Sequence, residues 1–113
     1  MEGSWLRMIT VKVIQSWNDA DILIEGHAGY AERGKDIVCA SMSTLYQNLV
    51  NSINQLSDSI VHEFTEENST RIHIGGLYEY SRALVDSFKF GCQSLAMTYP
   101  NNVEYIDVQS HME

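Results

Sequence analysis

Two residues with complementary chemistry, His27 and Cys39, lie in the stretch GHAGYAERGKDIVCASMS, which spans residues 26–43. A thiolate is a strong nucleophile, and an imidazole can take up the thiol proton and later pass it to a leaving amine. Three of the seven glycines of the chain fall in the same stretch, at positions 26, 29 and 34. The stretch is therefore either a turn that contains reactive residues or an active site with a flexible loop over it.

Asp36 precedes a segment with helical periodicity and is the expected N-cap of that helix. Its carboxylate can accept hydrogen bonds from the unpaired backbone amides of the first turn. Ile37, Val38 and Cys39 would then occupy the first three helical positions, at the positive end of the helix dipole. We expect this position to lower the pKa of Cys39 to about 3.5–7.5. We also expect the first-turn amides, including that of Cys39, to stabilise an acyl oxyanion.

A simpler explanation exists for each residue taken alone. A cysteine in the first turn of an amphipathic helix is often a small buried apolar residue. A histidine at a strand end is often structural or solvated. Because Cys39 and His27 occur together around a loop that contains glycines, a cysteine–histidine enzyme is a serious candidate, although spacing alone is a weak signal.

Metal binding is the second chemical possibility. The available ligands are His27, Cys39, His62, His73 and Cys92. They show none of the short paired spacings of structural zinc sites, so we expect no metal and no cofactor. His62 and His73 are expected at ordinary strand positions, and Cys92 on the apolar face of a helix. The sequence also contains no nucleophile elbow, dinucleotide fingerprint or phosphate loop.

Length and composition indicate the broad class of the protein. A chain of 113 residues with 44% hydrophobic content is typical of one globular domain. It has no apolar run long enough for a membrane span and no visible secretory signal, which favours the cytoplasm and free thiols. The net charge of −8 disfavours direct binding to nucleic acid and suits a basic protein partner.

Hydrophobic periodicity predicts five strands and two helices. We expect strands at residues 8–15, 22–26, 59–64, 71–76 and 103–109, and helices at 37–56 and 80–99, with turns at 16–21 and 65–70. The element order is then β-β-α-β-β-α-β. This order predicts an α+β two-layer sandwich, in which two helices cover one face of a mostly antiparallel sheet. Residues 1–7 are expected to form a tail, and residues 8–113 a single domain.

The 26–43 stretch resembles the signature of the ribosomal-processing cysteine protease family, Prp. That signature has Gly-His-Ala at a strand end, a loop with glycine, then Asp-Ile-Val-Cys-Ala and a serine one turn later. The matching residues are Gly26, His27, Ala28, Asp36, Ile37, Val38, Cys39, Ala40 and Ser43. The motif is long and specific, and the similarity in element order covers most of the chain from Met8 onward.

The resemblance implies a cytoplasmic, homodimeric cysteine endopeptidase with Cys39 as nucleophile and His27 as catalytic histidine. Gly26, Asp36 and Ser43 match supporting positions of the family. Asp36 either caps the helix alone or also orients His27. Ser43 lies on the same helical face as Cys39, where it either hydrogen-bonds near the thiol or is a small packing residue.

The resemblance also implies a substrate, a large-subunit ribosomal protein from which a short N-terminal extension is removed after an aromatic residue. Gly29, Tyr30 and Gly34 belong to the loop that we expect to gate the site. The alternative is a non-catalytic peptide-binding or ribosome-assembly module, in which the loop holds a peptide without cutting it. The presence of both Cys39 and His27 favours the enzyme, because binding alone requires neither.

Overall fold

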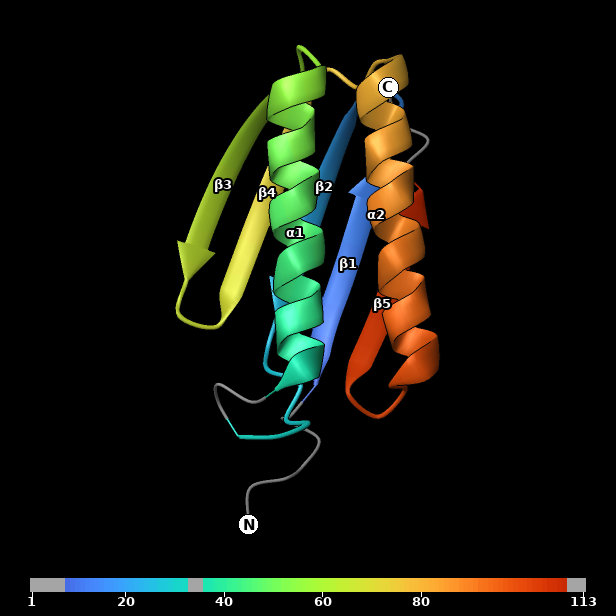
Figure 1. Cartoon of the computed structure of the whole chain (residues 1–113). Coiled ribbons are helices and arrows are strands. Elements are labelled where there is room, and N and C mark those ends of the chain that lie inside the picture. Colours follow the sequence, from blue (N-terminus) through green and yellow to red (C-terminus); the bar gives the residue numbers. More distant parts are fainter. Residues whose placement is uncertain (1–7, 33–35, 110–113) are drawn as a thin grey trace.

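The chain folds into a five-stranded sheet that two helices cover on one face (Figure 1). The structure, a computed structural model, describes residues 8–32 and 36–109. The predicted tail at residues 1–7 and Gly34 of the predicted loop lie outside the described residues. The elements are β1 (Ile9–Gln15), β2 (Asp19–Glu25), α1 (Ile37–Leu56), β3 (Ile60–Glu66), β4 (Ser69–Gly75), α2 (Glu79–Thr98) and β5 (Val103–Gln109). The predicted α+β class and element order are confirmed.

The strands lie in the order β3-β4-β2-β1-β5. Neighbouring strands are antiparallel except β1 and β5, which are parallel. Figure 1 shows that the β3–β4 turn, the α2–β5 turn and the start of α1 all lie at the same end of the molecule, where β2 also ends. In the described segments, neither helix is long and apolar enough to cross a membrane.

The core lies between the sheet and the helices. Alternate residues of β1 face the helices and are buried, as the period of a strand requires. The spacing of apolar residues in the first helix predicts a buried face at Val38, Met42, Leu45, Leu49, Ile53 and Leu56. Four of these six are buried: Val38, Met42, Leu49 and Ile53. Leu56, also predicted for this face, is 61% exposed and is the last residue of α1.

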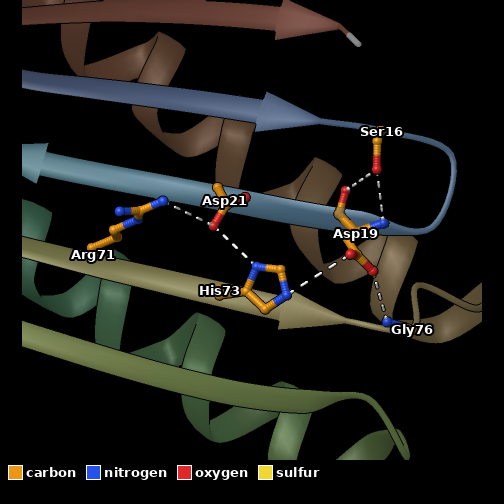
Figure 2. A network of polar contacts seen from close by, with 6 residues as sticks. All are labelled: Ser16, Asp19, Asp21, Arg71, His73 and Gly76. Carbon is orange, nitrogen blue, oxygen red and sulfur yellow. Dashed lines mark hydrogen bonds and ion pairs between the residues drawn. The ribbon is translucent and has the colours of Figure 1, made fainter. Parts of the chain in front are cut away.

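The predicted turn at residues 16–21 is too long, because β2 begins at Asp19. Strand pairing on both sides outweighs the polar composition here: Asp21 lies opposite Ile14 of β1 and His73 of β4. The two aspartates lie on the open face of the sheet (Figure 2), where Asp21 Oδ1 is 3.0 Å from His73 Nδ1 and Asp19 accepts from the Gly76 N–H. The turn predicted at residues 65–70 is also too long, because the turn between β3 and β4 comprises only residues 67–68.

Gly26 ends β2 in a conformation that only glycine adopts without strain. Its φ is +93°, and a Cβ built on it would lie 2.2 Å from the carbonyl oxygen of Met8. Its N–H donates to the Asn68 carbonyl at 2.9 Å. The backbone before His27 therefore passes too close to its neighbours to accommodate a side chain.

We expect Gly26→Ala to lower the free energy of unfolding by about 2 kcal/mol or more, from left-handed strain and the contact with Met8. Gly75→Ala is the matched control, since its Cβ would meet His73 Nε2 at an ordinary 3.7 Å. This control should change stability by less than about 1 kcal/mol. Urea unfolding measures both variants, and equal losses would contradict the close approach at Gly26.

Candidate active site

The carboxylate of Asp36 joins the start of α1 to the loop before it. Its Oδ1 accepts from the backbone amides of Val38 and Cys39, both at 3.0 Å. Its Oδ2 accepts from the amides of Tyr30 at 3.0 Å and Ala31 at 3.4 Å. Burial acts to raise the pKa of Asp36, but these four N–H donors outweigh burial and lower it. The predicted N-cap is confirmed, and its side chain is ionised at neutral pH.

Cys39 lies half-buried in the first turn of α1 and faces the end of β2. Its Sγ accepts a hydrogen bond from the Ala28 N–H at 3.4 Å. Ala28 is fully buried and directly follows His27. The fold thus brings the two ends of the 26–43 stretch together, with the thiol beside the backbone that carries the histidine.

The prediction that the helix start lowers the pKa of Cys39 is wrong. Burial raises the pKa of this thiol, the Ala28 N–H lowers it in part, and the negative charge of Asp36 raises it further. The amides of Val38 and Cys39 donate to Asp36 and not to the thiol, so they do not offset the effect of burial. The thiol therefore lies next to a carboxylate and is protonated at neutral pH, and an oxyanion would have to compete with Asp36 for these two amides.

Two asparagines hold the segment that contains His27. The exposed imidazole has its Nε2 2.6 Å from Oδ1 of Asn68, in the β3–β4 turn. Nδ2 of Asn102, which precedes β5, donates to the Ala28 carbonyl at 2.8 Å. Sequence reasoning identified neither residue, because each is an ordinary turn residue locally. Asn68 is separated from His27 by 41 residues and Asn102 from Ala28 by 74, so only the tertiary fold reveals the contacts.

The remaining predicted site residues are Ser43, Gly29 and Tyr30. Ser43 is exposed, one turn beyond Cys39 on α1. Gly29 has a φ of +64°, and the ring of Tyr30 packs edge-on against Tyr99 with centroids 5.3 Å apart. The gating role predicted for this loop stays a prediction.

The residues considered as metal ligands are dispersed over the molecule. Cys92 is fully buried in the core, where burial raises its pKa to about 12. His73 binds Asp21 on the open face of the sheet (Figure 2), and His62 lies opposite His73 on β3. In residues 8–32 and 36–109, no three His, Cys, Asp or Glu side chains are grouped so that they could hold a metal ion.

An open pocket of about 560 Å³ lies between α1 and α2, and Cys39 is not among the residues that line it. Its walls are mostly small or apolar side chains, from Ile37, Ala40, Ser41, Thr44, Leu45, Gly91, Ser94, Leu95 and Thr98. A second pocket, of about 490 Å³, lies at the far end of α1 around Leu56 and Tyr80. It is roughly 25 Å along the helix from Cys39, too far to share a ligand side chain with the thiol.

The fold, with Cys39 at the start of α1 beside the segment that carries His27, is typical of a class of cysteine proteases. The model of one such family, cysteine protease Prp, matches residues 8–104. The chain belongs to this family.

Named relatives agree with this assignment. The ribosomal processing cysteine protease Prp of two Staphylococcus aureus strains is 27% identical over 103 residues, covering 85% of this chain and 95% of each relative. The crystal structure of S. aureus Prp with a covalently linked product peptide has a TM-score of 0.78 at 25% identity, covering 88% of this chain and 99% of that one. The structure of SMU.848 from Streptococcus mutans has a TM-score of 0.75 at 32% identity, covering 91% and 96%.

We expect iodoacetamide to modify Cys39 before Cys92, because Cys39 is half-buried whereas Cys92 has no exposed surface. Since the pKa of Cys39 is raised, its rate of labelling should still be rising as the pH passes about 8.5, the usual thiol value. Peptide mapping after timed labelling measures the order and the rate. Modification of Cys92 first would contradict the structure.

Asp36→Asn should speed the labelling of Cys39 at neutral pH. The asparagine oxygen can still accept from Val38 and Cys39, but the negative charge that raises the pKa of the thiol is gone, and so is the acceptor of the Tyr30 and Ala31 amides. Asp58→Asn is the matched control, because Asp58 follows the far end of α1, well beyond the ~10 Å screening length in buffer. An unchanged rate in Asp36→Asn would show that the carboxylate does not control the thiol.

Proposed function

We propose that the protein is a cysteine endopeptidase in which Cys39 is the nucleophile and His27 the general base and acid. The observation that carries this proposal is the contact between the Ala28 N–H and Cys39 Sγ. It holds the thiol at the start of a helix, beside the residue that follows His27, in a member of a cysteine protease family.

The raised pKa of Cys39 determines the order of the chemical steps. The resting thiol is protonated, so His27 removes its proton as the sulfur attacks the carbonyl carbon of the substrate. His27 then gives this proton to the amide nitrogen as the C–N bond breaks, which leaves a thioester on Cys39. Water, deprotonated by His27, attacks the thioester carbonyl, and the thiol regains its proton.

The proposed substrate is a large-subunit ribosomal protein, from which a short N-terminal extension is removed after an aromatic residue. The S. aureus relatives are named ribosomal processing proteases, and one was crystallised with a linked product peptide. The net charge of −8 favours encounter with a basic ribosomal protein in the cytoplasm.

We also propose that the protein acts as a homodimer. The open face of the sheet carries exposed apolar side chains, among them Ile60, which is 62% exposed, and Phe64, which is 59% exposed. Strand register places Ile14 and Val108 on the same face. A second copy of the chain would cover them.

The supporting roles follow from the contacts around the thiol. Asp36 and Gly26 position the two backbone segments on either side of Cys39. Ser43 is accessible from solvent for contact with a bound peptide. The loop that contains Gly29 and Tyr30 would move aside when the substrate binds. This motion would break the edge contact of Tyr30 with Tyr99 and the hydrogen bonds from the Tyr30 and Ala31 amides to Asp36.

Incubation with the extended ribosomal protein under reducing conditions, followed by mass spectrometry, tests the proposal. Cys39→Ala should abolish cleavage, and His27→Ala should reduce it by about 100-fold or more. Both variants should keep the wild-type circular dichroism spectrum, because a methyl group fits in place of each side chain.

Cys92→Ala is the control for loss of a thiol, since Cys92 lies in the core away from the site, and it should still cleave the substrate. Wild-type turnover by Cys39→Ala would refute the mechanism. A substrate that stays intact with the wild-type protein would favour the non-catalytic peptide-binding or ribosome-assembly module.

A further inference from the structure

We propose that Asn68 is a positioning residue that selects the tautomer of His27 in which Nδ1 is free to face the thiol. This inference rests on the proposed function, because it assigns His27 the role of base. Asn68 does not itself touch the reacting atoms, and it acts through the imidazole.

Asn68 contacts two consecutive residues at the end of β2. Its backbone oxygen accepts from the Gly26 N–H at 2.9 Å. Its side-chain Oδ1 lies 2.6 Å from His27 Nε2. An amide oxygen has no proton to donate, so Nε2 must carry the hydrogen in this contact. In a neutral imidazole the other nitrogen, Nδ1, then has a free lone pair and can accept the proton of Cys39.

The turn itself does not explain the choice of asparagine. Residues 67–68 form a two-residue connection between β3 and β4, where asparagine is usually favoured because it tolerates positive φ. In the described part of the chain, however, positive φ occurs only at glycines. Asn68 therefore has an ordinary backbone conformation, and its contact with His27 is the observed use of its side chain.

Asp36 is the charged residue that could otherwise orient His27, but its carboxylate oxygens already accept from other donors. Both of its oxygens accept from backbone amides, two from the loop and two from α1. Asn68 differs from a carboxylate because it orients the ring without adding a negative charge beside it.

Cleavage kinetics give the first test. Asn68→Ala should lower kcat by about 10- to 100-fold with little change in KM, because one hydrogen bond that orients the base is lost. Asn68→Asp retains an acceptor and should recover most of the lost rate. Glu67→Ala, in the same turn and exposed, is the matched control and should cleave at the wild-type rate. Wild-type kcat in Asn68→Ala would overturn the proposal.

The ¹⁵N chemical shifts of His27 give a second test that requires no activity. With His27→Ala used for assignment, the wild-type ring should show a protonated Nε2 and an unprotonated Nδ1 in its neutral form. Asn68→Ala should shift this ring toward a mixture of tautomers, whereas Glu67→Ala should not. The same tautomer in Asn68→Ala and wild type would exclude the positioning role even if the protein is a protease. Tautomer selection by Asn68 in a protein that does not cut the ribosomal substrate would instead refute only the proposed function.

Discussion

The four hydrogen bonds of the Asp36 carboxylate are the constraint on which the site depends. They fix where α1 begins, and therefore where Cys39 lies relative to the end of β2. They also hold the backbone of Tyr30 and Ala31 against the helix. One side chain thus sets the position of Cys39 and of the loop beside it.

The same carboxylate opposes ionisation of the thiol that it positions. Burial and the charge of Asp36 both raise the pKa of Cys39, so in the free protein Cys39 is a thiol and not a reactive thiolate. Under the proposed mechanism, deprotonation then occurs only when His27 and a bound peptide are both in place. Such a site resists adventitious alkylation and oxidation, since the thiolate is the reactive form.

The features that the sequence predicted correctly are those whose contacts join residues close together in the chain. Asp36, Cys39 and α1 follow from interactions within a few residues, and the Gly-His-Ala and Asp-Ile-Val-Cys-Ala motifs name the reactive pair. The predicted start of β2 was wrong because pairing with β1 and β4 is non-local and outweighs the polar composition of residues 19–21. The predicted pKa of Cys39 was wrong because burial in the tertiary fold raises it, and because the N-cap takes up the amides that were expected to stabilise a thiolate.

The site is assembled where four segments converge at one end of the sheet (Figure 1). β2 and α1 contribute His27 and Cys39, whereas the β3–β4 and α2–β5 turns contribute the asparagines that hold residues 26–28 in place. The sheet makes this convergence possible, because β4 pairs with β2 along its full length and brings Asn68 beside Gly26. Residues far from Cys39 in the sequence therefore contact the segment that carries His27, and these contacts depend on the register of the sheet.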